Sequence, residues 1–455
     1  MGSDRHTIGR RSLIKSSVAL GAGAALSGSA LIGVRAQSAT PVASFGVAKN
    51  VIFAMGDGMG QAHLDFARLL TVGPYERLAI ETLPATGLSG TNAVTRDTYA
   101  LITDSAAAAT AMATGHKTYN GAIGVDIDGN TVTNIVELAK AAGKSIGIAT
   151  TADVPGASSA AFTSHIDDRD KKSEIAAQLI ADGKVDVILG GGEDYFLPAG
   201  TEGVFPDNAD LEEASEGTQG DLIAAAETAG YTVVRNPADL AAAQGPLVLG
   251  LFANQSLYKE EPENIDDVFT TGVSLSDLVA KAIEILSQNP NGFFLFIEED
   301  GIDEYSHEWM AEYTVRAVQE LDNAVATALD FATTDGETLL VVTADHECGG
   351  LTIIDVLDAI EDEDYERPAN SEGPFRAFGT GYQFLINWAT PEHSGVRVPV
   401  KAFGPGSELF YGDYENTQLF VKMVQAFGFE LPAGAGETPI PGVTPDEVPS
   451  ATPVN

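Results

Sequence analysis

The stretch LSDLVAKAIEILSQNPNGFFLFIEE, residues 275–299, contains both halves of a pattern that recurs along the chain. Its first part, residues 275–288, is typical of a helix that buries one face. The apolar run that begins at Phe293 does not alternate with polar residues, which is typical of a strand buried on both faces. A helix followed by such a strand is the repeating unit of parallel sheets, so this stretch predicts an α/β fold.

Similar apolar runs recur along the chain. They are residues 50–56, 145–151, 185–192, 246–252, 293–299, 339–345 and 398–403. Helix-like stretches at 134–144 and 172–184 precede two of these runs, as 275–288 precedes another. This alternation predicts a central, mostly parallel β-sheet with helices on both faces. Residues 193–245 and 355–392 are loop-rich, and we expect them to be insertions at the rim of the sheet.

The two ends of the chain differ from its centre. Arg10 and Arg11 precede a weakly hydrophobic Ala/Gly/Leu stretch, so residues 1–36 are predicted to be a twin-arginine signal peptide. We therefore expect export to the periplasm or the extracellular medium. A membrane anchor is the alternative, but Gly and Ser dilute the apolar run. Residues 432–455 contain six prolines and are predicted to form an extended Pro/Thr-rich tail.

The chain is strongly acidic, with 25 Lys and Arg against 65 Asp and Glu, for a net charge of −40. Removing residues 1–36, with five basic residues and one acidic, would leave 20 against 64, or −44. Such a field disfavours nucleic acid and anionic membranes as partners. It suits metal cations, and it would repel a phosphate-bearing substrate unless metals reverse the local sign. Because Cys348 is the single cysteine, no intramolecular disulfide is possible.

Acidic and histidine residues follow several of the predicted strands. Asp57 follows the first run, and residues 293–297 of the fifth lead into Glu298, with Asp303 and His307 just beyond. Residues 339–344 of the sixth lead into Asp345 and His346. Carboxyl ends of parallel strands meet at one edge, where ligands bind. Carboxylates crowded there would repel one another unless cations bind, and mixed Asp and His suit Zn²⁺ while oxygen ligands suit Mg²⁺.

Taken singly, each of these residues has a commoner explanation. An Asp after a strand is usually a turn or a helix cap, and the pair Asp104-Ser105 before an alanine run fits a helix N-cap. We expect His63, His116 and His165 to be structural. Acidic or nucleophilic residues after four strands, two of them with histidine, are harder to explain in this way.

These residues lie in motifs that resemble those of the alkaline phosphatases. The motifs are GDGMG (56–60), TDSAAAATAMATGHKTYNGAIGVD (103–126), EEDGIDEYSH (298–307), TADHECGGL (343–351) and EHSGVRVPVKAFGPG (392–406). The resemblance covers roughly residues 48–430, and it implies an alkaline-phosphatase-like fold with a catalytic domain over 37–431.

The resemblance also implies a role for each site residue. Ser105 would be the nucleophile that takes up the phosphoryl group, with Arg169 clamping two phosphate oxygens and Asp104 orienting Arg169. The implied cofactors are two Zn²⁺ and one Mg²⁺. Their implied ligands are Asp303, His307 and His393 for the first zinc, Asp345 and His346 for the second, Asp57 bridging the second zinc and the magnesium, and Ser158 and Glu298 for the magnesium. The implied substrates are small phosphate monoesters hydrolysed at alkaline pH, and a homodimer is possible.

Three positions depart from the family's usual pattern. Gly156 replaces an Asp or His near the magnesium, and Glu304 replaces a Lys, His or Trp. Glu304 would weaken phosphate binding if it points inward. Cys348 replaces a Thr or His, and is either an inert packed residue or a redox-sensitive group near the metals.

Two other functions remain open from the sequence. The first is a phosphodiesterase or a sulfatase on the same scaffold, although DSAAAA lacks the Pro and Arg that follow a sulfatase nucleophile. The second is a non-catalytic, acidic, calcium-binding secreted protein, for which Ser105 would be dispensable.

Overall fold

The computed structural model describes residues 46–95, 98–205, 215–260, 262–269, 271–355 and 366–436. The predicted signal peptide and residues 437–455 of the predicted tail lie outside this range. Residues 432–436 are described, and the Gly436 amide donates to the Gly115 carbonyl over 2.8 Å. None of the helices in the described ranges has the length and apolar character needed to cross a membrane.

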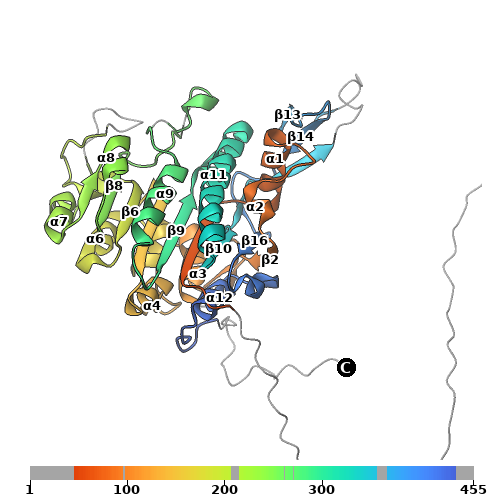
Figure 1. Cartoon of the computed structure of the whole chain (residues 1–455). Coiled ribbons are helices and arrows are strands. Elements are labelled where there is room, and N and C mark those ends of the chain that lie inside the picture. The colour runs from red at the N-terminus through yellow and green to blue at the C-terminus, as the bar shows by residue number, and fades with distance from the viewer. Residues whose placement is uncertain are drawn as a thin grey trace, which may run out of the picture. The chain divides into compact units, whose positions relative to one another are not determined.

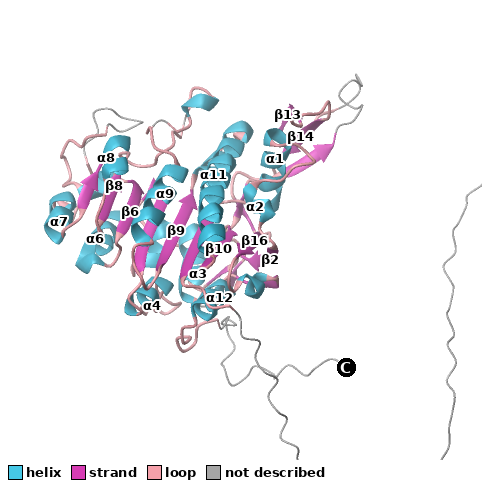
Figure 2. Cartoon of the chain, viewed as in Figure 1, coloured by secondary structure: helices cyan, strands magenta, loops and turns pink. Residues whose placement is uncertain are grey.

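A ten-stranded sheet forms the centre of the described residues (Figures 1 and 2). In spatial order its strands are β17 (Gly412–Glu415), β2 (Ala85–Gly90), β16 (Val398–Phe403), β10 (Thr338–Thr343), β1 (Asn50–Gly56), β9 (Phe293–Glu299), β5 (Ser145–Asp153), β6 (Val187–Gly191), β8 (Val248–Leu251) and β7 (Thr232–Val234). Within this sheet only β16 runs antiparallel to its neighbours. The predicted mostly parallel sheet is therefore confirmed, and all seven apolar runs contribute a strand.

The central strands are buried on both faces because their apolar residues alternate between two cores. In β9, Phe294 and Phe296 belong to one hydrophobic cluster, while Leu295 and Ile297 belong to the other. Every residue of β1 and β9 is buried. This is why their sequences show continuous apolar runs rather than alternation.

Helices cover both faces, as predicted. One face carries α1 (Gln61–Thr71), α2 (Ala79–Thr82), α8 (Pro237–Ala242), α9 (Leu275–Leu286), α10 (Gly301–His307) and α11 (Ala311–Asp335). The opposite face carries α3 (Ser105–Thr114), α4 (Ile135–Ala141), α5 (Ala157–Thr163), α6 (Lys172–Ile180), α7 (Leu222–Ala229) and α12 (Thr417–Phe427). The three helix-like stretches of the sequence become α4, α6 and α9. Figure 1 shows α9 and α11 side by side over the sheet, where they pack together.

The expected rim insertion at 193–245 was only partly right. Residues 222–242 form α7, β7 and α8, and β7 is the edge strand of the central sheet. The sequence pattern did not indicate this strand because β7 has three residues and only Val234 is buried.

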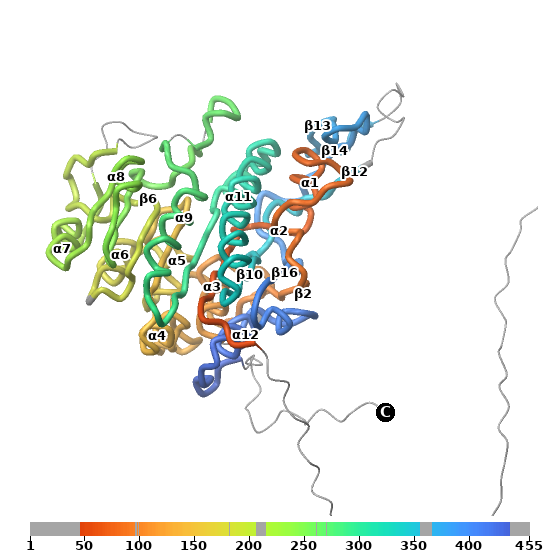
Figure 3. The backbone as a smooth tube through the Cα atoms, viewed as in Figure 1, coloured from red at the N-terminus to blue at the C-terminus, as the bar shows by residue number. Residues whose placement is uncertain are grey.

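The expected insertion at 355–392 contains a sheet of its own. Its strands are β12 (Thr352–Asp355), β14 (Gln383–Asn387) and β13 (Ser371–Arg376), in that spatial order. This small sheet packs against α1, which lies far away in the sequence (Figure 3). Two further strand pairs are β11 (Glu347–Cys348) with β15 (His393–Ser394) and β3 (Ala93–Val94) with β4 (Tyr99–Ala100).

Candidate active site

The sheet brings the predicted site residues to one edge. Asp57 directly follows β1, and Glu298 lies near the end of β9, where it is in register with Met55 of β1. The helix α10 follows β9 and carries Asp303 and His307. Asp345 and His346 follow β10, and the β11–β15 pair places His393 opposite Cys348. The remaining predicted residues reach the same edge from the start of α3, from α5 and from the loop that precedes α6.

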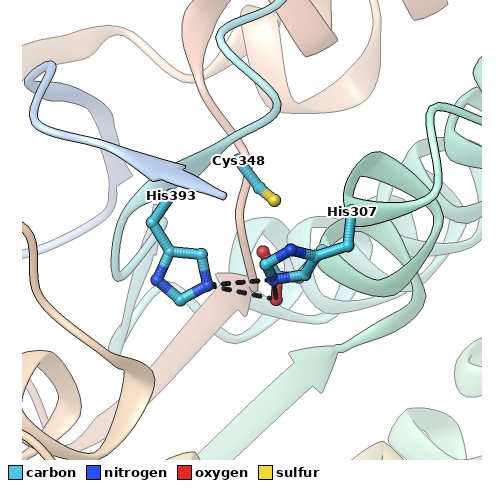
Figure 4. Close-up of side chains that lie close together, drawn as sticks. His307, Cys348 and His393 are labelled. Atoms are coloured by element: carbon cyan, nitrogen blue, oxygen red, sulfur yellow. Dashed lines mark hydrogen bonds and ion pairs between the residues drawn. The ribbon is translucent and has the colours of Figure 1, made fainter. Parts of the chain in front are cut away.

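Asp303 is the centre of a first group with two histidines, His307 and His393, which Figure 4 shows close together. Its Oδ2 lies 3.2 Å from His307 Nε2 and 3.6 Å from His393 Nε2, and the two Nε2 atoms are 3.1 Å apart. The Nδ1 atoms of these rings donate to backbone carbonyls, to Pro391 over 2.5 Å and to Thr103 over 2.8 Å. Both Nε2 atoms are therefore free to act as metal ligands, oriented by their carbonyl partners.

His346 is the centre of a second group. Its Nε2 lies 3.1 Å from Asp345 Oδ2, 3.5 Å from Asp57 Oδ1 and 3.3 Å from Ser105 Oγ. All four residues are buried. The serine hydroxyl thus lies next to an imidazole that two carboxylates also contact.

A third group continues from Asp57 into a cavity of about 150 Å³. Ser158 Oγ donates to Asp57 Oδ2 over 3.5 Å, and Thr150 Oγ1 donates to Glu298 Oε2 over 2.7 Å. Carboxylate oxygens of Asp57 and Glu298 lie within 4.8 Å of each other. This group offers oxygen atoms, in contrast to the imidazole-rich first group.

Ser105 is the first residue of α3, and Asp104 is its N-cap. Asp104 Oδ1 accepts from the Ala107 amide over 2.9 Å, which explains the Asp-Ser pair as a helix start. Its Oδ2 accepts from Arg169 Nη1 over 3.3 Å and from the Gly121 amide over 2.8 Å. Asp104 can therefore cap the helix and also bind Arg169, because each of its carboxylate oxygens has its own partners.

Several ionisable groups of the cluster have strongly shifted pKa values. Burial and the neighbouring Asp345 raise the pKa of Asp57 well above its usual range. Burial and Asp300 raise the pKa of Glu298 to about 8. The hydrogen bond with Asp303 raises the pKa of His307 to about 9. Burial alone would raise the pKa of Asp303, but His307 and His393 outweigh burial and hold it well below its usual range.

Divalent cations fit these residues. Within the described chain, four buried atoms at the centre of the cluster have no hydrogen-bond partner, namely Asp57 Oδ1, Asp303 Oδ1, Asp345 Oδ2 and His346 Nδ1. Leaving buried polar atoms unpaired is costly, and cations would remove that cost. Mixed nitrogen and oxygen donors in the first two groups match zinc, and the oxygen donors of the third match magnesium.

The structure adds two residues that the sequence reasoning did not assign as ligands. Cys348 belongs with Asp303, His307 and His393, all offering ligand atoms within 4.8 Å of one another, and its side chain extends toward this group in Figure 4. Asp300 joins Asp57 and Glu298 in the same way. Asp300 directly follows β9, and its position after a predicted strand, like that of Asp57, was the signal that could have found it.

The structure also places three other residues that the sequence analysis singled out, Glu304, Gly156 and His165. Glu304 is exposed and lines the same cavity as Ser105 and Arg169. A Cβ at Gly156 would lie 2.8 Å from the Asp153 carbonyl oxygen, so a side chain there would require a backbone shift. His165 Nε2 lies 2.9 Å from Glu137 Oε1, a partner outside the cluster, as expected of a structural histidine.

Comparison with known proteins agrees with this geometry. The sequence model of the alkaline phosphatase family matches residues 48–367. The chain is 34% identical over 441 residues to streptomycin-6-phosphate phosphatase of Streptomyces griseus, covering 86% of this chain and 93% of the relative. It is 32% identical over 438 residues to alkaline phosphatase of Escherichia coli, covering 84% and 87%. The solved structure of alkaline phosphatase from the Antarctic bacterium TAB5 is similar with a TM-score of 0.69 and 28% identity, covering 84% of this chain and 99% of that one.

The α/β fold, the cluster of candidate metal ligands at the sheet edge and these relatives together define a class, the metal-dependent phosphatases. Within that class the chain belongs to the alkaline phosphatase family. It is a hydrolase with alkaline phosphatase activity on phosphate monoesters, and it uses divalent metal ions.

Proposed function

We propose that the enzyme works through a phosphoserine on Ser105. The observation that carries this proposal is the position of Ser105 Oγ, at a helix N-terminus and 3.3 Å from His346 Nε2. A serine needs help to lose its proton, and a hydroxyl held among metal-ligating groups receives it.

Two zinc ions and one magnesium ion are the proposed cofactors. Asp303, His307 and His393 would hold one zinc. The second zinc would bind Asp345 and His346, and Asp57 would bridge it to a magnesium held also by Ser158 and Glu298. When bound, the cations neutralise the carboxylates, lower the pKa of the serine hydroxyl and polarise the phosphoryl oxygens.

The chain's own residues perform the transfer. Ser105 Oγ attacks the phosphorus atom as the ester oxygen leaves on the opposite side, and water later releases inorganic phosphate from the serine. Arg169 binds two phosphoryl oxygens with its planar guanidinium, and Asp104 positions that group. The helix N-terminus at Ser105 adds positive potential where the phosphoryl charge lies.

The test is to trap the covalent intermediate. Wild-type enzyme is incubated with a phosphate monoester, quenched in acid and examined by peptide mass spectrometry. We expect phosphate on Ser105, with kcat falling by about 10³-fold or more in Ser105→Ala. Ser164→Ala is the matched control, because Ser164 is also buried but lies outside the site. Phosphate on another residue, or turnover in Ser105→Ala close to that of the wild type, would overturn the proposal.

Export, domain boundaries and assembly also belong to the proposal. Residues 1–36 would direct twin-arginine export to the periplasm or the extracellular medium. Residues 37–431 would then form the catalytic domain, with 432–455 as a tail, and the enzyme could form a homodimer. The supporting observation is the Arg10-Arg11 pair before the weakly hydrophobic stretch. Replacing both arginines with lysine and following activity across cell fractions tests the route.

Nothing in the geometry favours the alternatives that the sequence left open. Comparing turnover of a nitrophenyl monoester with that of the matching diester separates a monoesterase from a diesterase. A preference for the diester would reject the monoesterase assignment of the site.

A further inference from the structure

Asp300 lies in the third group of the site but has no role in the function proposed above. Ligand atoms of Asp57, Glu298 and Asp300 all lie within 4.8 Å of one another. All three residues line the cavity that also contains Ser105 and Arg169. Three carboxylates so close together repel one another strongly unless a cation lies between them.

The surroundings hold Asp300 in place without using both of its oxygens. Its Oδ2 accepts a hydrogen bond from the Tyr258 hydroxyl, and its amide donates to Thr151 Oγ1 over 3.0 Å. The carboxylate still has Oδ1 for another partner. This side chain is anchored from two directions before any ion binds.

The nearby cations are committed elsewhere. Lys172 Nζ lies 2.5 Å from Asp153 Oδ2, and Arg169 Nη1 lies 3.3 Å from Asp104 Oδ2. These two basic residues line the cavity, but in the described chain neither Lys nor Arg forms an ion pair within 4.0 Å of Asp57, Glu298 or Asp300.

An independent observation points to a missing ligand. Asp57 is 2% exposed, and in the described part of the chain its only hydrogen-bond donor is the Ser158 hydroxyl, 3.5 Å from Oδ2, while Oδ1 has none. A buried carboxylate with a single long hydrogen bond, beside two further carboxylates, is matched by a hard divalent cation.

We propose that Asp300 is a carboxylate ligand of the third cation, together with Asp57 and Glu298. This inference rests on the third metal site of the proposed function. Three carboxylates and the Ser158 hydroxyl make an all-oxygen set, which selects Mg²⁺ or Mn²⁺ over Zn²⁺. Asp300 therefore makes this site more negative and more selective for a hard cation than Asp57 and Glu298 alone would.

The test measures cation binding directly. Protein with its zinc sites filled is titrated with Mn²⁺, and free Mn²⁺ is followed by electron paramagnetic resonance, with Mg²⁺ as competitor. We expect Asp300→Asn to weaken Mn²⁺ binding at one site by about 10- to 100-fold, the range seen when groups around a metal are removed. Asp300→Glu, which keeps the charge, should recover part of the loss.

Two further variants separate ligation from other effects. Tyr258→Phe removes the hydroxyl that anchors Asp300, so it should weaken Mn²⁺ binding, but less than Asp300→Asn does. Glu304→Gln is the matched control, because it removes a carboxylate from the same cavity but outside the group, and we expect it to change Mn²⁺ affinity by less than about 3-fold. Zinc content by elemental analysis shows whether each variant folds.

The outcomes are distinguishable. If Asp300→Asn binds Mn²⁺ like the wild type, or if Glu304→Gln matches its loss, Asp300 is not a ligand. If the wild type itself binds no Mn²⁺ beside its zinc ions, the third site of the proposed function fails instead.

Discussion

At the residue scale, Asp104 shows how one side chain joins local and tertiary structure. One oxygen caps α3, and the other holds Arg169 and the Gly121 amide. Any helix-starting serine or asparagine could cap, but only a carboxylate also forms an ion pair with the guanidinium.

Replacing Asp104 with Ser or Ala separates its two roles. Both variants lose the contact with Arg169, so the inhibition constant for inorganic phosphate should rise by about 3- to 10-fold. Serine can still cap the helix, and we expect Asp104→Ala to be less stable than Asp104→Ser by about 1 kcal/mol. Inhibition assays and thermal unfolding measure the two effects. An unchanged phosphate constant in both variants would show that Asp104 does not position Arg169.

Lys117 is a second residue whose setting has a measurable consequence. Its side chain is 1% exposed, with Nζ 3.3 Å from Glu415 Oε2 and donating to the Asn92 carbonyl over 2.5 Å. Burial lowers the pKa of this ammonium to about 8, although Glu415 opposes the shift.

We therefore predict that Lys117 makes the fold more stable as the pH rises. Below pH 8 the lysine is charged in both the folded and unfolded states, and the burial cost is constant. Between about pH 8 and 10.5 the unfolded chain binds more protons, so stability rises, by up to about 3 kcal/mol. Urea unfolding at pH 7.5 and 10.5 should show this gain in the wild type relative to Lys117→Met.

A difference in unfolding free energy between the wild type and Lys117→Met that does not change with pH would contradict the assignment.

At the element scale, α3 explains the alanine run. All ten of its residues are buried, and it packs against α5 and α12. Small side chains let these helices approach closely while the helix presents Ser105 at the sheet edge. A helix buried on every side has no polar face, so its sequence shows no amphipathic period.

Enlarging one of these alanines should strain the packing. Ala109 is 0% exposed, and we expect Ala109→Leu to destabilise the fold by about 1–3 kcal/mol. Ala225→Leu, at an exposed position of α7, should have little effect. Thermal unfolding of both variants makes the comparison. Equal melting temperatures for the two variants would mean that the packing around α3 accommodates a larger side chain.

At the scale of the whole molecule, bound metal ions should stabilise the fold, a role that disulfides have in many exported proteins. The sequence has one cysteine and a net charge of −40, and the carboxylates gathered at the sheet edge repel one another in the absence of cations. The ions should therefore contribute to folding as well as to catalysis.

Chelation should abolish activity and lower the melting temperature together. Calorimetry and activity assays before and after EDTA measure both effects, and adding zinc and magnesium should restore them. Ser105→Ala with its metals bound should lack activity but keep its melting temperature. A protein shown to be metal-free by elemental analysis that kept either property would contradict the assignment.

Much of the site could be predicted from the sequence because it depends on short stretches of neighbouring residues. Continuous apolar runs gave the strands, and the residues directly after them, such as Asp57 and Asp345, share one edge in any parallel sheet. His393 and Arg169 lie outside such positions, and only the resemblance to a known family indicated them.

Tertiary structure alone decided the rest. The direction of β16 and the edge position of β7 depend on pairing with distant strands, which short apolar runs do not encode. The packing of α10 and the β11–β15 pair brings Cys348 to the histidines, and the Tyr258 hydroxyl contacts Asp300, which lies close to Asp57. Local sequence determines which residues can bind a cation, but the distances among their oxygen and nitrogen atoms are set by contacts between segments up to 290 residues apart.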